Sequence, residues 1–187
     1  RFERLKKAAG FRYQATVDEL QTNTSRGLDK ELITTLSTGA YPREGTSVII
    51  TGATGSGKSF IASALGHPAC RQGYKGTYFN LQKLLMKIKM ARAGGTIYKL
   101  MENIAKTPLL ILDDFGLSQI KGQPQHDLME IIEDRHSKAS TIISSQLPVS
   151  SWFDVISEAT IADAILDRLI HTSHRIELKG ESLRKKN

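Results

Sequence analysis

The stretch TGATGSGKSF, residues 51–60, decides the fold because it joins an expected strand to an expected helix through a glycine-rich loop. It contains the pattern G-x-x-x-x-G-K-S, whose glycines are Gly52 and Gly57, and apolar runs precede and follow it. Glycines let successive backbone N–H groups turn inward around phosphate oxygens, and the N-terminus of the next helix adds partial positive charge. The sequence therefore predicts a nucleotide triphosphate site rather than a simple glycine turn.

The residues of this loop have separate expected roles. Lys58 should reach the β- and γ-phosphates, and the hydroxyl of Ser59 should ligate Mg²⁺. Nothing in the loop itself selects adenine over guanine. The expected nucleotide-binding residues are Gly52, Ala53, Thr54, Gly55, Ser56, Gly57, Lys58, Ser59 and Phe60.

Two acids end a second apolar run, LLILDDFG at residues 109–116. In open α/β sheets the ligand lies at the carboxyl ends of the strands, which is where this pattern puts both acids. Asp113 is expected to hold Mg²⁺ through water, and Asp114 to orient or deprotonate the attacking water. The alternative is that Asp114 only caps the following turn.

Two further stretches supply candidate catalytic residues. Gln146 ends the run TIISSQLP, where a polar side chain could sense the γ-phosphate, with Ser145 as its competitor and a structural amide as the alternative. Arg168 lies on the expected helix of AILDRLIHTSHRIEL and could reach the γ-phosphate of a neighbouring subunit. Arg175 is a weaker candidate for that role, and an ion pair of Arg168 with Asp163 or Asp167 is the alternative.

Charge is distributed unevenly along the chain, whose net charge is +7. No Asp or Glu occurs from Gly45 to Met101, although this segment is rich in lysine and arginine. A field of one sign favours a polyanionic partner, with nucleic acid as the first choice. Ion pairs in space with the acids between Asp113 and Asp134 are the alternative. The expected DNA-binding residues are Lys83, Lys87, Lys89, Arg92 and Lys99.

Strand and helix patterns alternate along most of the chain. Apolar or β-rich runs predict five strands, near residues 47–51, 76–80, 108–114, 140–146 and 174–178. Helical periodicity predicts helices at residues 81–95, 96–106, 125–137, 149–157 and 161–171. Another should begin at Lys58, be kinked or interrupted by Pro68, and stop at Gly73. This alternation favours an α/β fold in which helices cover both faces of a parallel sheet.

The remaining features concern the domain organisation, the single cysteine and the absence of a long apolar run. Residues 1–44 are expected to form an N-terminal linker with short helices at 16–20 and 28–38, and residues 45–187 the nucleotide-binding core. One cysteine, Cys70, excludes an intramolecular disulfide and suits a cytoplasmic protein. No apolar run approaches the roughly 20 residues of a membrane span, so we expect no membrane association.

In their order along the chain, the phosphate loop, LLILDDFG, TIISSQLPVSSWF and ADAILDRLIHTSHRIELKGESLRK resemble the IstB-like ATP-binding proteins. These are AAA+ helper ATPases of insertion-sequence transposition, related to DnaC-type helicase loaders. The likeness extends to RFERLKKAAGFRYQATVDEL at the start and to LGHPACRQGY after the phosphate loop. Two of these stretches favour the transposition helpers over the related helicase loaders, namely SSQLPVSSWF and HRIELKGESLRK.

The resemblance implies a P-loop NTPase of the AAA+ class, with a three-layer α/β/α core and a five-stranded sheet in the order 5-1-4-3-2. It implies that this chain lacks a separate lid domain and begins after the small N-terminal domain of the family. ATP and Mg²⁺ are the implied cofactors, and Arg184 is a possible second sensor.

The same resemblance implies ATP-dependent assembly into rings or helical oligomers on duplex DNA, distortion of that DNA, and recruitment of a transposase. One alternative is a DnaC-like loader that prefers single-stranded DNA and a hexameric helicase. Another is a nucleotide-gated DNA-binding module with little turnover, which Asp114 leaves open because it is one methylene shorter than the Glu of many relatives.

Overall fold

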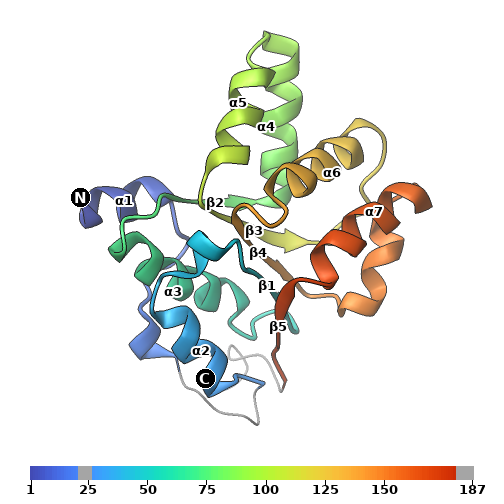
Figure 1. Cartoon of the computed structure of the whole chain (residues 1–187). Coiled ribbons are helices and arrows are strands. Elements are labelled where there is room, and N and C mark those ends of the chain that lie inside the picture. Colours follow the sequence, from blue (N-terminus) through green and yellow to red (C-terminus); the bar gives the residue numbers. More distant parts are fainter. Residues whose placement is uncertain (21–26, 180–187) are drawn as a thin grey trace.

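The computed structural model describes residues 1–20 and 27–179, and its centre is one five-stranded sheet (Figure 1). All strand pairs are parallel, and the strand order is β2-β3-β4-β1-β5. Read from the other edge, this is 5-1-4-3-2, which confirms the predicted order. The strands are β1 (Ser47–Thr51), β2 (Gly76–Asn80), β3 (Leu109–Phe115), β4 (Ser140–Ser145) and β5 (Ser173–Glu177).

Helices cover both faces of the sheet, because successive side chains along each strand point to opposite sides. Ile49 belongs to one hydrophobic core, whereas its neighbours Val48 and Ile50 belong to the other. The core of Val48 and Ile50 contains α1 (Phe2–Ala9), α2 (Lys30–Ser37) and α3 (Lys58–Arg71). The core of Ile49 contains α4 (Leu81–Gly94), α5 (Ile97–Lys106), α6 (Gln123–Arg135) and α7 (Ala159–Ile170). Three layers result, as predicted.

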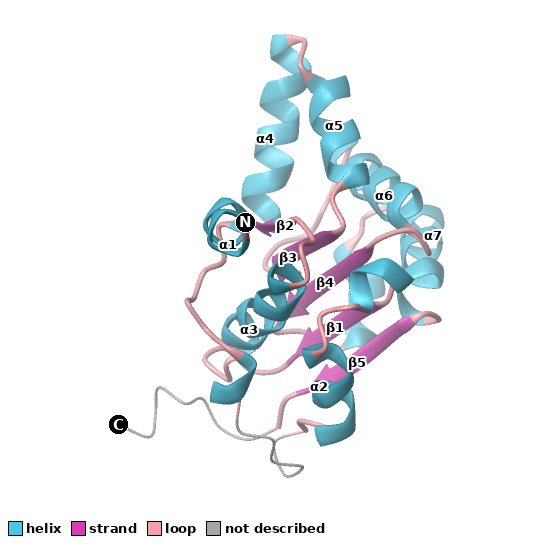
Figure 2. Cartoon of the chain, turned by 60° about the vertical axis from the view of Figure 1, so that its left-hand side comes forward, coloured by secondary structure: helices cyan, strands magenta, loops and turns pink. Residues whose placement is uncertain are grey.

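Short 3₁₀ helices complete the described part of the chain: η1 (Val17–Glu19), η3 (Tyr41–Glu44) and η4 (Val149–Val155). The last occupies most of the predicted helix at 149–157. Figure 2 shows α4 and α5 as a hairpin that extends beyond the sheet next to β2. No helix among the described residues is both long and apolar enough to cross a bilayer.

Two local features differ from the sequence-based expectations. Helix α3 runs through Pro68 to Arg71, so the predicted interruption at Pro68 is wrong, while the predicted kink stays a prediction. Proline removes one N–H bond from a helix, but Pro68 is buried and the packing of α3 against the sheet outweighs that loss. Helix α1 was not predicted; Phe2, Leu5 and Ala9 pack its apolar side onto the core.

Arg135 ties α5, α6 and β4 together from inside the protein. Its side chain is 1% exposed. The guanidinium donates to Thr141 Oγ1 at 3.0 Å, to the carbonyl of Ile104 at 2.7 Å, and to the carbonyls of Thr107 and Ser140. Burial lowers the pKa of Arg135 to about 10. One side chain therefore supplies hydrogen bonds to four oxygens at once.

We expect Arg135→Met to lower the free energy of unfolding by about 2–4 kcal/mol, because several buried acceptors lose their donor at once. Arg43→Met is the matched control, since Arg43 is exposed. Urea unfolding of both variants measures the difference. A loss below about 1 kcal/mol for Arg135→Met would show that other groups or water replace the guanidinium.

Candidate nucleotide-binding site

A cavity of about 460 Å³ lies at the carboxyl ends of the strands. It brings together the glycine loop, the end of β3, the residue after β4 and part of the N-terminal segment. This is the edge at which open α/β sheets bind ligands. Its lining residues are Arg12, Tyr13, Thr54, Gly55, Gly57, Lys58, Ser59, Phe60, Asp114, Leu117 and Gln146.

The glycine loop joins β1 to α3 with a backbone that requires glycine. Gly55 and Gly57 have φ angles of 81° and 100°, in the region that side chains disfavour. A Cβ on Gly52 would lie 2.7 Å from Ser56 Oγ. The loop therefore closes tightly before α3 begins at Lys58.

The ammonium group of Lys58 lies against this loop. Its Nζ donates to the carbonyls of Gly52 at 2.8 Å and Ala53 at 3.0 Å, and the residue is 8% exposed. Burial lowers the pKa of Lys58, while Asp113 and Asp114 act in the opposite direction. A cation held at the mouth of the loop suits the binding of phosphate oxygens.

Ser59 and Asp113 meet as the sequence predicts for a metal site. Ser59 Oγ donates to Asp113 Oδ2 at 2.7 Å, and Asp113 is 1% exposed. The hydroxyls of Ser144 and Tyr78 also donate to this carboxylate, and burial with the Asp113 contact raises the pKa of Tyr78. A hydroxyl and a carboxylate are hard oxygen donors, so these residues fit Mg²⁺, which would neutralise phosphate charge there.

Asp114 occupies an irregular position at the end of β3. Its φ is 63°, and the register with β4 shifts between Leu112 and Phe115. This shift turns its carboxylate to the cavity, where Asn80 Nδ2 donates to Oδ2 at 2.9 Å. Burial, and then the charge of Asp113, raise the pKa of Asp114. The carboxylate lines the cavity and is bonded by an amide side chain.

Asn80 was missed by the sequence analysis. Its side-chain oxygen accepts from the backbone N–H of Lys83 at 3.2 Å and so caps α4, while its nitrogen contacts Asp114. The available signal was an Asn that ends a strand directly before a helical pattern, which is typical of an N-cap. Asn80 thus connects the cavity to the first turn of the α4–α5 hairpin.

Gln146 faces the loop, and Ser145 does not. Thr54 Oγ1 donates to Gln146 Oε1 at 2.8 Å. Ser145 is buried; its Oγ donates to the carbonyl of Phe115 at 2.6 Å and accepts from the N–H of Leu147. Of the two candidates, Gln146 therefore has the position that a γ-phosphate sensor needs, and the sensor role itself stays a prediction.

Arg12 and Tyr13 enter the cavity from outside the predicted core. They lie in the stretch RFERLKKAAGFRYQATVDEL, to which the family resemblance extends, but no site role was predicted for them. Arg12 Nη1 lies 3.3 Å from Ser59 Oγ and 3.7 Å from Asp113 Oδ2. The ring of Tyr13 lies 5.8 Å from that of Phe60. The N-terminal segment is therefore part of this site.

Arg168 lies near the amino ends of the strands, on the side of the sheet opposite to the glycine loop. It lines a small cavity with Ser47 and Thr141, near the amino ends of β1 and β4, whereas the glycine loop follows the carboxyl end of β1. Its Nη2 pairs with Glu133 Oε1 at 3.1 Å, so the predicted alternative of Asp163 or Asp167 as partner is wrong. Strand β1 is five residues long, so its amino end lies about 13 Å from the glycine loop that follows its carboxyl end.

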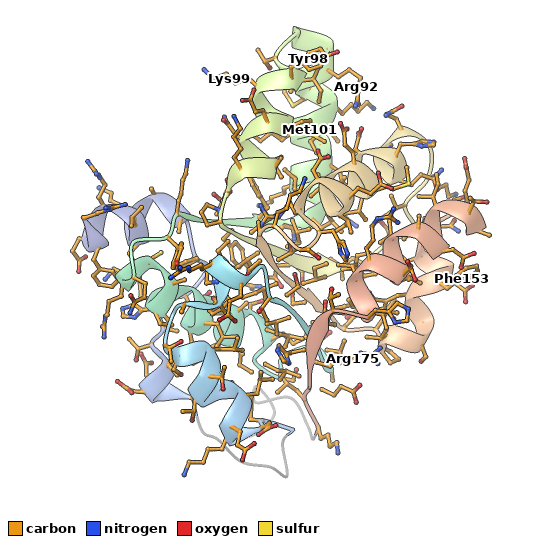
Figure 3. The ribbon with its side chains drawn as sticks, in the orientation of Figure 1. Arg92, Tyr98, Lys99, Met101, Phe153 and Arg175 are labelled. Atoms are coloured by element: carbon orange, nitrogen blue, oxygen red, sulfur yellow. The ribbon has the colours of Figure 1, made fainter. Side chains whose placement is uncertain are left out.

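The two other candidate arginines are placed differently. Arg175 is exposed on the edge strand β5, as Figure 3 illustrates. Arg184 lies outside the described residues.

The predicted DNA-binding residues lie on the α4–α5 hairpin. Lys83, Lys87 and Lys99 line a groove of about 610 Å³ between the two helices, together with apolar residues such as Met86 and Met90. Lys89 lines a separate cavity of about 350 Å³ that also contains Asp114. Among the described residues, none of these four lysines forms an ion pair.

Arg92 differs from these lysines because it has an acidic partner, and its role in DNA binding stays untested. Its guanidinium makes two bonds to Asp127 on α6, at 2.6 and 3.2 Å, and Asp127 is 2% exposed. This ion pair is the predicted alternative to a nucleic-acid contact, in which a basic residue pairs with an acid distant in sequence. Because its charge is balanced, Arg92 holds the hairpin to α6, and we leave it out of the proposed DNA surface (Figure 3).

Comparison with known proteins gives one consistent result. A family model described as IstB-like ATP binding protein matches residues 1–187. A Sinorhizobium fredii protein named as an insertion sequence ATP-binding protein is 45% identical over 177 residues, which cover 95% of this chain and 72% of that protein. A Pseudomonas fluorescens protein named for insertion sequence IS1162 is 42% identical over 152 residues, 81% of this chain and 66% of that protein.

Solved structures show the same fold at low sequence identity. The DnaC helicase loader has a TM-score of 0.72 at 22% identity, over 89% of this chain and 98% of that one. AMPPCP-bound DnaA from Aquifex aeolicus has a TM-score of 0.74 at 16% identity, over 94% of this chain and 53% of that one.

Proposed function

The chain belongs to the family of IstB-like ATP-binding proteins, and from this premise we propose that it is a DNA-binding AAA+ ATPase that assists a transposase. ATP and Mg²⁺ bind at the cavity beside the glycine loop. The ATP-bound protein assembles on duplex target DNA and recruits or stimulates the transposase. Hydrolysis then releases or resets the assembly.

The proposed roles follow the chemistry of each side chain. The N–H groups of the glycine loop and the ammonium of Lys58 bind the phosphates. Ser59 and Asp113 would hold Mg²⁺. Asp114 orients the attacking water or accepts its proton, and Gln146 contacts the γ-phosphate or that water.

The observation that carries this proposal is the double contact of Asn80. Its amide bonds to Asp114 in the nucleotide cavity and to the N–H of Lys83 at the start of α4. The hairpin lysines that form no ion pair lie on α4 and α5, so the Asn80 side chain connects the proposed hydrolytic acid to the cationic hairpin. DNA that moves α4 would move Asn80 and therefore shift Asp114. DNA binding and ATP hydrolysis are thus physically connected.

The position of Arg168 fits the proposed assembly of several copies. This residue lies at the amino edge of the sheet, about 13 Å or more from the glycine loop of its own chain. An extended arginine side chain is too short to cross that distance. If Arg168 contacts a γ-phosphate, the nucleotide therefore belongs to a neighbouring copy.

The groove lysines give the test of the DNA surface. We expect Lys87→Ala with Lys99→Ala to weaken duplex binding about tenfold and to make the slope of log K against log salt less steep by about 2, since each lost phosphate contact removes about one counterion. Fluorescence anisotropy over a salt series measures both quantities.

The matched control for this pair is Lys30→Ala with Lys138→Ala, which removes the same charge from exposed positions outside the hairpin. An equal loss of affinity in both double variants would assign the effect to net charge and not to the hairpin. A DnaC-like loader, the second candidate, would show the same lysine dependence on single-stranded DNA.

A further inference from the structure

Arg12 lies against the two residues that fit Mg²⁺. Its Nη1 is 3.3 Å from Ser59 Oγ and 3.7 Å from Asp113 Oδ2, the oxygen that Ser59 also bonds. Asp113 is buried, whereas the Arg12 side chain is 45% exposed to the cavity and solvent. A guanidinium and a divalent cation would both be attracted to this one carboxylate oxygen.

The backbone around Arg12 is held in place by its neighbours. Phe11 is 9% exposed and packs so closely on α3 that a Cβ on Gly66 would lie 2.4 Å from its ring. The N–H of Tyr13 donates to Ser63 Oγ at 3.2 Å. Arg12 can therefore change rotamer but stays next to the cavity, and its charge remains close to Lys58 and Ser59.

We propose that Arg12 and Mg²⁺ compete for Asp113, and that the displaced guanidinium binds the phosphates of the nucleotide. The inference rests on the proposed nucleotide function and adds a binding residue from the N-terminal segment. Without metal, the guanidinium of Arg12 pairs with Asp113. With metal bound at Asp113, the guanidinium contacts the phosphates of the nucleotide. The same side chain thus opposes metal binding alone and favours nucleotide binding.

Removing the charge of Arg12 should raise the affinity for a divalent ion and lower the affinity for ATP. Arg12→Gln takes away the competitor, so Asp113 should bind a divalent ion about 3- to 10-fold more tightly without nucleotide. The same variant loses the phosphate contact that Arg12 makes once metal occupies Asp113, so ATP should bind about 3- to 10-fold more weakly at saturating Mg²⁺. A merely structural role would weaken both affinities.

The experiment uses Mn²⁺ as the metal probe, because oxygen sites for Mg²⁺ also take Mn²⁺. Loss of the free-ion EPR signal gives the Mn²⁺ affinity of the full chain without nucleotide. Calorimetry at saturating Mg²⁺ gives the ATP affinity. Arg4→Gln is the matched control, since it removes an equal charge from an exposed position on α1.

Tighter Mn²⁺ binding with weaker ATP binding in Arg12→Gln alone supports the inference. A Mn²⁺ affinity within twofold of the Arg4→Gln control, or a fall in both affinities, overturns it. If the wild-type chain bound no ATP, the proposed function and the phosphate contact would both fail. The Mn²⁺ titration would still decide the competition for Asp113, because it needs no nucleotide.

Discussion

Replacing Lys58 with alanine should weaken ATP binding by more than about 100-fold, because the phosphates lose a charge-assisted donor in a largely buried site. Lys58 is the ammonium that the structure places at the mouth of the glycine loop, 2.8 Å from the carbonyl of Gly52. Calorimetry with ATP and Mg²⁺ measures the change.

Lys75→Ala is the control for this substitution, since Lys75 is exposed and lies outside the cavity. Because Lys58 also bonds loop carbonyls, urea unfolding of the variant checks that the loss is not one of folding. ATP affinity that survives in a folded Lys58→Ala protein would contradict the phosphate-loop assignment.

Replacing Arg168 with alanine should lower ATP hydrolysis by about 10³-fold and leave ATP binding intact. The reason is that an arginine supplied by a neighbouring copy stabilises charge that develops only in the transition state. Its position at the opposite sheet edge from its own glycine loop is the basis for this expectation. Phosphate release and calorimetry separate the two effects.

Glu133→Gln is the matched control, because it breaks the same ion pair and keeps the arginine. A mixing experiment then tests the action between copies. Lys58→Ala subunits keep Arg168 but lack a working site, and Arg168→Ala subunits have the reverse defect. Mixed together, they should regain hydrolysis. A mixture as inactive as its parts, or an equal loss in Glu133→Gln, would contradict the role.

The sequence predicted the structural features that local residue patterns determine. All five strands were predicted, and their order followed from the resemblance. The central strands β1, β3 and β4 were readable because buried parallel strands have continuous apolar runs. The glycine loop was readable since its backbone demands glycine at fixed positions. The end of β3 was predicted to hold Asp113 because carboxyl ends of strands meet at one edge.

The parts that escaped prediction depend on contacts between distant segments. Arg12 reaches Ser59 across 47 residues, and Asn80 reaches Asp114 across 34. The left-handed backbone of Asp114 arises from a register shift with β4, which no local pattern encodes. The pairing of Arg92 with Asp127, 35 residues away, was recognisable only as a general possibility.

The central claim is that ATP controls binding to duplex DNA. Its most direct test is the affinity of the protein for a matched duplex and single strand at one stated salt concentration, with and without ATP, while phosphate release is followed. We predict tight duplex binding only with ATP. A clear preference for the single strand, or duplex binding that ignores nucleotide, would contradict the account, and the first of these would favour a helicase loader.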